Sequence, residues 1–185
     1  MSEWNRKLSI MRRYDLTAHI YDMRYSEEQT EKIDAALKSI NIREHSIILD
    51  VGCGTGLLFN HVAEKTRMTV GLDISKKALL LAKERAEKVA NVHLIWADAD
   101  VLPFRDEAFS HVFAITLIQN MPNPARTLKE VKRVTKNHSV IVVTGLKKKF
   151  SFKSFSRLLR KVSLNVTEMK NENLKCYVAI CSRIH

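Results

Sequence analysis

Residues 50–56 read Asp50-Val51-Gly52-Cys53-Gly54-Thr55-Gly56, and this stretch decides the fold of the 185-residue chain. The apolar run Ile47-Ile48-Leu49 precedes it, and a helical pattern starts at Leu57. A buried strand, a glycine-rich loop and a helix in this order bring backbone N–H groups and a helix N-terminus against a nucleotide-like ligand. The sequence therefore predicts an α/β protein with a ligand site at this loop.

The spacing of the glycines indicates which ligand the loop binds. Dinucleotide-binding folds use G-x-G-x-x-G, with the third glycine inside the first helical turn. Here the glycines lie at 52, 54 and 56, and Leu57 takes the place of that third glycine. A tight turn with a leading acid suits a ligand that carries a charged amino acid, and we expect S-adenosylmethionine. The alternative is a glycine-rich turn without a ligand.

Two more predicted strands end in an acid. Residues 68–73 end at Asp73, about 20 residues beyond the glycine loop, where a carboxylate can accept both ribose hydroxyls. Residues 92–98 end at Asp98. Because ligands of open α/β sheets bind at the carboxyl ends of the strands, we expect Asp50, Asp73 and Asp98 to meet at one edge. A single acid of this kind has an alternative role as a helix cap.

The chain resembles the class I S-adenosylmethionine-dependent methyltransferases, in the broad group that includes the ubiquinone-biosynthesis methyltransferases. Four stretches within residues 45–145 carry the resemblance: Leu49–Gly56, Gly71–Ser75, Ala97–Phe104 and Leu128–Val134. The resemblance implies one Rossmann-like domain, residues 1–185. Its seven-stranded, mostly parallel sheet would have the order 3-2-1-4-5-7-6, an antiparallel last strand and helices on both faces. Residues 1–44 would be a helical lid, 45–145 the cofactor-binding core, and 146–185 a basic helix and hairpin.

The resemblance also implies a set of cofactor-binding residues, with Asp73 on the ribose and Asp98 on the adenine amino group beside the backbone of Ala99. The full set is Asp50, Gly52, Cys53, Gly54, Gly56, Asp73, Ile74, Asp98, Ala99 and Thr116.

The candidate catalytic residues are Gln119, Asn120 and Tyr21. Residues 116–122 follow the fourth predicted strand and should line the acceptor pocket, where the two amides would hold an amide, a base edge or a carboxylate. Loop capping is their alternative role. Residues 14–25 resemble the family's lid, with Tyr14 and Tyr21 near the transferred methyl and Arg24 on the methionine carboxylate; a helix that only packs is the alternative.

Further patterns predict the remaining elements. Ser26-Glu27-Glu28-Gln29 is a capping box that would open a helix to about Ser39, after a separate helical stretch over 11–22. Asn123-Pro124 would start a helix that ends near Thr135. Helices are also expected over 76–90 and 151–162. Strands are expected over 111–116, 140–144, 165–169 and 175–181, with a hairpin at 171–173.

Positive charge is concentrated in the last third of the chain. Residues 126–185 hold 15 Lys and Arg but three acids, whereas residues 1–125 are nearly neutral, and the whole chain has a net charge of +11. The dense part comprises Lys147, Lys148, Lys149, Lys153, Arg157, Arg160 and Lys161. Such asymmetry is typical of proteins that bind a polyanion, most often nucleic acid. A solvated basic face is the alternative.

Composition excludes several classes. The length suits one domain, and no run of 18 apolar residues predicts a membrane span. The first residues do not resemble a signal peptide. Three cysteines make no disulfide framework and the seven histidines no zinc spacing, so we expect a cytoplasmic protein without a metal. Asn120-Met121-Pro122-Asn123 lacks the aromatic residue common in methyltransferases of planar nitrogens.

Two functional classes remain in front. The first is a tRNA or rRNA methyltransferase, supported by the basic third; such minimal subunits resemble those that pair with a small zinc-ribbon activator, and the N-terminal Tyr-Asp segment resembles the tRNA wobble-uridine enzymes. The second is a small-molecule methyltransferase acting on a quinone, an amine or a carboxylate. A partner subunit without activity is a third reading, against which the intact glycine loop argues.

Overall fold

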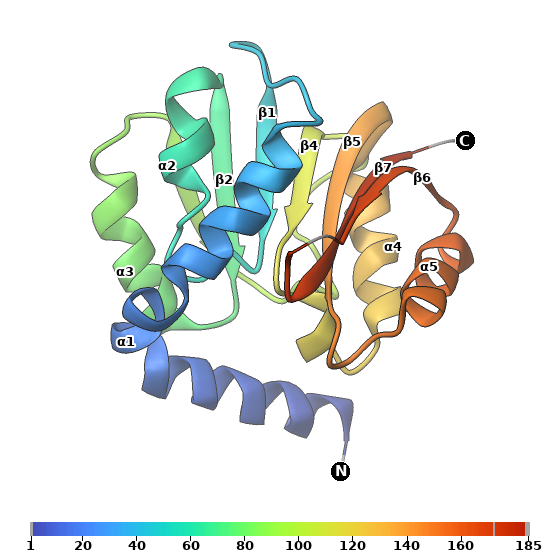
Figure 1. Ribbon diagram of the computed structural model, residues 1–185. Coiled ribbons are helices and arrows are strands. Elements are labelled where there is room, and N and C mark those ends of the chain that lie inside the picture. Colours follow the sequence, from blue (N-terminus) through green and yellow to red (C-terminus); the bar gives the residue numbers. More distant parts are fainter. Residues whose placement is uncertain (1, 172, 184–185) are drawn as a thin grey trace.

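Seven strands form one sheet in the order β3-β2-β1-β4-β5-β7-β6 in the computed structural model, which describes residues 2–171 and 173–183 (Figure 1). The strands are β1 Ile47–Val51, β2 Met68–Asp73, β3 Val92–Trp96, β4 Phe109–Ala114, β5 Thr135–Leu146, β6 Leu164–Lys170 and β7 Cys176–Arg183. Strands β1 to β5 are parallel, whereas β7 runs antiparallel to both β5 and β6. The predicted strand order and the antiparallel last strand are confirmed.

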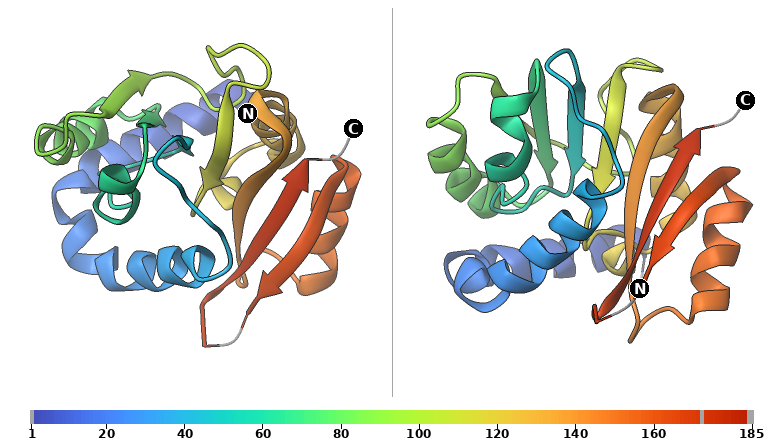
Figure 2. Two further views of the ribbon diagram at one scale, coloured as in Figure 1. Left: turned by 90° about the horizontal axis from the view of Figure 1, so that it is seen from above. Right: turned by 45° about the horizontal axis from the view of Figure 1, so that its top comes forward.

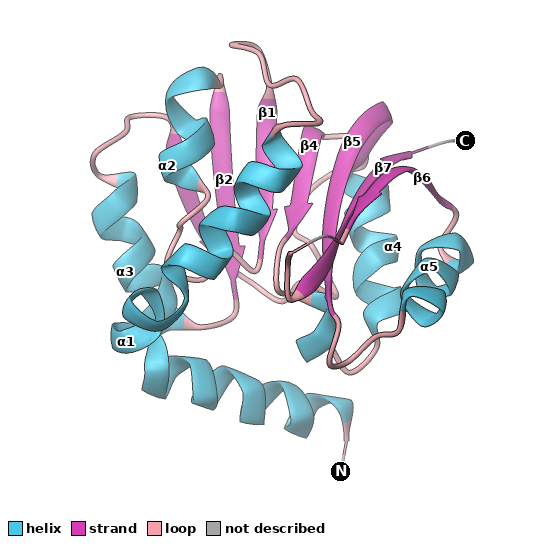
Figure 3. Cartoon of the chain, in the orientation of Figure 1, coloured by secondary structure: helices cyan, strands magenta, loops and turns pink. Residues whose placement is uncertain are grey.

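Within the described residues, five α-helices surround the sheet (Figures 2 and 3). They are α1 Glu3–Leu37, α2 Phe59–Val62, α3 Lys76–Ala86, α4 Pro124–Val134 and α5 Phe152–Lys161. The second half of α1 packs with α2 and α3 on one face, and α4 and α5 lie on the other. The central strand β1 is consequently buried on both sides: Ile48, Leu49 and Val51 have no exposed surface, as expected for a parallel strand between helix layers.

Short polar side chains start three helices where the sequence places them. Asn123 accepts a hydrogen bond from the backbone N–H of Arg126, and α4 starts at the next residue, Pro124, as predicted. Ser75 and Ser151 cap α3 and α5 in the same way. Such caps satisfy backbone donors that a helix start otherwise leaves without partners.

Helix α1 differs from its prediction. It is one helix of 35 residues, capped by the hydroxyl of Ser2, and Ser26 lies in its interior instead of at a start. The capping-box prediction is wrong because Glu28 and Gln29 point inward and bind Lys32 and Tyr21 instead of closing a helix start. Figure 1 shows that α1 is bent: its first half crosses below the carboxyl ends of the strands, and its second half lies against the sheet.

Smaller differences affect element ends. No helix starts at Leu57, because the chain makes a turn first and α2 begins at Phe59. Helix α3 ends at Ala86, four residues early, since the Asn91 amide donates to the Ala63 carbonyl oxygen at 2.8 Å and holds the chain for β3. Strand β5 begins at Thr135, five residues before its predicted start at Val140. The predicted hairpin at 171–173 joins β6 to β7, and Glu172 lies outside the described residues.

Candidate active site

The glycine loop turns sharply at the end of β1. Gly52, Gly54 and Gly56 all have positive φ, at 74°, 54° and 81°, a conformation that glycine adopts without strain. A Cβ on Gly56 would overlap the Phe59 ring, whereas a Cβ on Gly54 would meet no atom within 4 Å. Gly56 therefore allows close packing, and Gly54 presents bare backbone to open space.

The carboxylate of Asp73 joins the loop to the end of β2. It accepts hydrogen bonds from the backbone N–H of Gly54 at 2.9 Å and of Ser75 at 2.8 Å. Burial raises the pKa of Asp73, although these N–H donors oppose the shift. One donor binds each oxygen, so each retains a lone pair for a ligand hydroxyl.

A cavity, here called the strand-end cavity, lies over the carboxyl ends of β1, β2 and β4. It is lined by side chains of α1, by the glycine loop and by the residues that follow β2, β3 and β4. Seven of the ten predicted cofactor residues line it: Gly52, Gly54, Asp73, Ile74, Asp98, Ala99 and Thr116. Asp50 and Cys53 line a smaller adjoining hollow, and Gly56 lines neither space.

Asp50 is the most perturbed acid of the site. Its side chain is buried, and burial together with the nearby charge of Asp73 raises its pKa to about 8. A carboxyl group in this state gains from a positively charged partner, because a cation favours its ionised form. The hollow beside Asp50 is therefore suited to a ligand ammonium group.

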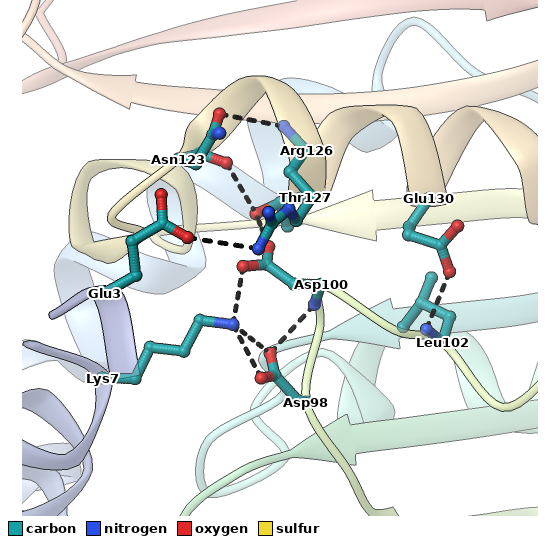
Figure 4. Close-up of polar contacts among 9 residues, drawn as sticks. All are labelled: Glu3, Lys7, Asp98, Asp100, Leu102, Asn123, Arg126, Thr127 and Glu130. Atoms are coloured by element: carbon teal, nitrogen blue, oxygen red, sulfur yellow. Dashed lines mark hydrogen bonds and ion pairs between the residues drawn. The ribbon is translucent and has the colours of Figure 1, made fainter. Parts of the chain in front are cut away.

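Asp98 is paired with the N-terminal helix (Figure 4). Lys7 of α1 donates to both oxygens of Asp98, at 2.7 and 2.6 Å, and lies 2.6 Å from Asp100. Asp100 is buried and also accepts from the hydroxyl of Thr127 on α4. Lys7 was not predicted as a site residue, and no spacing in the sequence links it to an acid 91 residues away.

Two aspartates of α1 fasten the helix to the opposite rim of the cavity. Asp15 accepts a hydrogen bond from the hydroxyl of Ser75, and Asp22 accepts one from Thr55 at 2.6 Å. Asp22 also pairs with Arg85 of α3, whose guanidinium donates to the Thr55 carbonyl oxygen at 2.7 Å. Helix α1 thus contacts both the glycine loop and α3.

The two predicted catalytic amide side chains, Gln119 and Asn120, lie in different surroundings. Asn120 lines the strand-end cavity, donates to the hydroxyl of Tyr14 at 2.8 Å and accepts from Arg13 at 3.2 Å. Gln119 does not line the cavity, and its buried carbonyl oxygen has no partner among the described residues. Ile118, which precedes both amides, belongs to the core, and the three residues form a short 3₁₀ turn over 118–120.

Tyr21 lines both spaces and is held by a buried polar network. Its hydroxyl accepts from Gln29 at 3.0 Å, and Gln29 accepts from the hydroxyl of Thr116 at 2.9 Å. Lys32, only 2% exposed, donates to Thr116 at 3.3 Å and pairs with Glu28 at 2.6 Å. Burial raises the pKa of Tyr21, so its hydroxyl stays protonated.

The prediction for Arg24 is wrong. Arg24 is exposed and does not line either space, because α1 continues without a break and turns this side chain to solvent. Lys32 is the buried cation of this region instead. Sequence reasoning missed it, since a lysine among charged helix residues normally lies on the solvated face.

The residues fit S-adenosylmethionine by their chemistry. Asp73 offers free lone pairs for the ribose hydroxyls, and Gly54 presents backbone without a Cβ. Asp50 suits an ammonium group, and apolar side chains such as Ile74 and Leu117 line the cavity. No group of three or more His, Cys, Asp or Glu within 2–171 and 173–183 is arranged to hold a metal ion. No helix in that same part of the chain is long and apolar enough to cross a bilayer.

Comparisons with known proteins agree with this geometry. Residues 49–143 match the family model described as a methyltransferase domain. The malonyl-[acyl-carrier protein] O-methyltransferase of Marinomonas sp. is 30% identical over 142 residues, covering 76% of this chain and 52% of the relative. The demethylmenaquinone methyltransferase of Staphylococcus aureus is 29% identical over 137 residues, covering 72% and 56%. The chain spans about half the length of these curated relatives.

Solved structures share the fold. One solved structure is a complex between the Haloferax volcanii Trm112 methyltransferase activator and a methyltransferase. A chain of this complex superposes on the present chain with a TM-score of 0.83. It is 16% identical, and the match covers 93% of this chain and 98% of that one. A SAM-dependent methyltransferase from Aquifex aeolicus gives a TM-score of 0.72 at 20% identity, covering 82% and 89%.

Proposed function

We propose that this chain methylates RNA, either tRNA or rRNA. The chain belongs to the methyltransferase domain family, and its cofactor is S-adenosylmethionine. The cofactor supplies an electrophilic methyl group on its sulfonium sulfur. Asp73 would hold the ribose hydroxyls, Asp98 and the backbone of Ala99 the adenine, and Asp50 with the glycine loop the amino-acid end.

Positioning is the main task left to the protein. In-line displacement needs the acceptor atom aligned behind the methyl group, and alignment alone can supply several kcal/mol of rate enhancement. Tyr21 and Asn120 face the same cavity from the lid and from the loop after β4. Both are held by hydrogen bonds, to Gln29 and Tyr14. In this proposal they orient the acceptor group and keep water out.

The observation that carries the RNA assignment is a set of cations at the end of the sheet. Besides Lys147, six basic side chains between β5 and the end of α5 are exposed: Lys148, Lys149, Lys153, Arg157, Arg160 and Lys161. Within the described part of the chain, none of them forms an ion pair or a side-chain hydrogen bond. Exposed cations without acidic neighbours are free to neutralise phosphates.

A small zinc-ribbon activator is part of the proposal. The Haloferax structure holds a methyltransferase activator, and a chain of that complex matches 93% of this chain. The expectation from the sequence, that a minimal catalytic subunit works with such a partner, is consistent with this neighbour. We therefore propose that the chain methylates RNA together with such an activator, and that RNA methylation should be assayed with the activator present.

Filter binding of tRNA and rRNA fragments at several salt concentrations tests the RNA assignment. Charge reversal at Lys148 and Lys149 should weaken binding and lower the salt slope by about one unit per lost phosphate contact. Cofactor affinity should not change. The matched control is reversal at Lys65 and Lys88, two exposed lysines at the opposite edge of the sheet. RNA binding without salt dependence, or no binding with activator present, would contradict the proposal.

A small-molecule acceptor is the second candidate. The curated relatives named above act on a malonyl group carried by acyl-carrier protein and on demethylmenaquinone, and α1 covers the strand-end cavity. If RNA does not bind, this candidate takes precedence.

A further inference from the structure

An exposed aromatic ring lies among the cations at the start of α5. Phe152 is the first residue of α5, and 52% of its surface is exposed. Its ring packs edge-on against Tyr177 of β7 at 5.8 Å between centroids, and Tyr177 in turn stacks on the buried Phe155 at 5.7 Å. The ring of Phe152 is thus supported by Tyr177, which itself packs on Phe155, and it remains accessible to solvent.

Basic side chains flank this ring on both sides in the chain. Lys148 and Lys149 precede it in the turn after β5, and Lys153 follows it. Arg157 and Arg160 continue from Lys153 at spacings of four and three residues, so they lie along one side of α5. Lys147 is engaged differently: its ammonium donates to the Asn171 carbonyl oxygen and lies 5.7 Å from the Tyr177 ring.

The ring lies at the same edge of the sheet as the strand-end cavity. Strands β4 and β5 are parallel, so their carboxyl ends share one edge, and Figure 1 shows α5 following β5 from this edge. The Thr144 hydroxyl of β5 accepts the Thr116 N–H at 2.7 Å, and Thr116 lines the cavity. Lys147 comes three residues after Thr144, so the two Cα atoms are separated by at most about 10 Å of extended chain.

We propose that Phe152, supported by Tyr177, is a stacking platform for one base of a single-stranded RNA segment, with Lys148, Lys149 and Lys153 on the neighbouring phosphates. This inference rests on the proposed RNA function and adds to it the kind of RNA recognised. The strand would continue from the platform to the strand-end cavity, where the acceptor nucleotide enters.

The chemistry favours an unpaired strand over a duplex. Aromatic rings between cations bind single strands because every base has a face to stack, whereas the bases of a duplex are already stacked on one another. A lipid surface fits less well: an interfacial helix needs a broad apolar face, and the apolar side chains Phe155 and Leu159 of α5 have no exposed surface. Phe152 alone provides too little apolar area.

The test uses the full chain and a fluorescein-labelled, unstructured 12-nucleotide RNA, compared with the duplex of the same sequence. Phe152→Leu keeps an apolar side chain and removes the ring, and should weaken single-strand binding about 5- to 100-fold. Its salt slope should equal that of the wild type, because no charge changes. Phe152→Trp restores a larger ring and should bind at least as tightly as the wild type. Duplex affinity should be the same for all three proteins.

The outcomes separate this inference from the proposed function. RNA binding that depends on salt but not on Phe152 overturns the platform and leaves RNA as the substrate class. Equal losses for single strand and duplex overturn it too, as does loss of phosphatidylserine-vesicle binding with unchanged RNA binding. Absence of RNA binding by the wild type overturns both.

Discussion

The carboxylate of Asp73 connects two parts of the site, since it accepts the Gly54 N–H and also lines the strand-end cavity. Asp73→Asn should lower the affinity for S-adenosylmethionine about 10- to 100-fold. The ribose hydroxyls would lose hydrogen bonds to a charged group, each worth about 1.5–3 kcal/mol. Isothermal titration calorimetry measures this loss.

Glu44→Gln is the matched control, because Glu44 is exposed and lies before the amino end of β1, away from the cavity. It should bind the cofactor like the wild type. A folded Asp73→Asn protein with wild-type affinity would remove Asp73 from the ribose.

Asp50 makes the stability of the ligand-free protein depend on pH. Its pKa is about 8 in the folded protein, against about 3.9 for an unperturbed aspartate. Between these values the folded state retains a proton that the unfolded state has released, so stability falls as pH rises from about 4 to 8. Asp50→Asn removes this contribution.

Thermal melts from pH 5 to 8 test the shift. The melting temperature of the wild type should fall more steeply over this range than that of Asp50→Asn, and the variant should be the more stable protein near pH 8. Parallel profiles for the two proteins would show that Asp50 is ionised at neutral pH in the folded state.

Sequence spacing could predict the carboxylates and glycines of the site but not their partners. Asp73 and Asp98 follow strands, and parallel strands bring their carboxyl ends to one edge whatever the loops do. Lys7 and Lys32 lie on α1, and their contacts depend on how that helix crosses the sheet. The bend of α1 leaves no periodic signal, so these two buried lysines could not be predicted.

At the scale of elements, α1 is the least predictable part of the chain. Its sequence contains a capping-box pattern at 26–29 that local reasoning takes for a helix start, yet tertiary contacts of Gln29 and Lys32 keep the helix continuous. The short strands and α4 follow their local signals closely, because burial or a proline fixes them.

The contact of α1 with the sheet depends strongly on Lys7. Lys7→Met should destabilise the protein by about 3 kcal/mol, because Asp100, whose side chain is 2% exposed, would remain buried without its cation. Urea unfolding at pH 7 measures the change.

Lys83→Met is the control for lost charge on a helix. Lys83 faces Glu87 at 3.7 Å, and both side chains are about two-thirds exposed, so the variant should lose less than about 0.5 kcal/mol. Equal, small losses in the two variants would show that Lys7 does not hold α1 to the sheet.

At the scale of the molecule, the resemblance to the class I methyltransferases was enough to predict the strand order of the sheet. The position of the basic segment relative to the cavity was not predicted separately. It follows from β5 running parallel to β4, which brings Lys147–Lys149 to the edge where Thr116 lies.

Transfer of labelled methyl from S-adenosylmethionine tests the central proposal most directly. The protein, with a zinc-ribbon activator present, is incubated with separate RNA, protein and small-metabolite fractions of its source cell, and Asp73→Asn is the negative control. Label should appear in the RNA fraction, and Asp73→Asn should transfer much less at limiting cofactor. Label confined to the protein or small-metabolite fraction would contradict methylation of RNA, and no label in any fraction would contradict the methyltransferase activity itself.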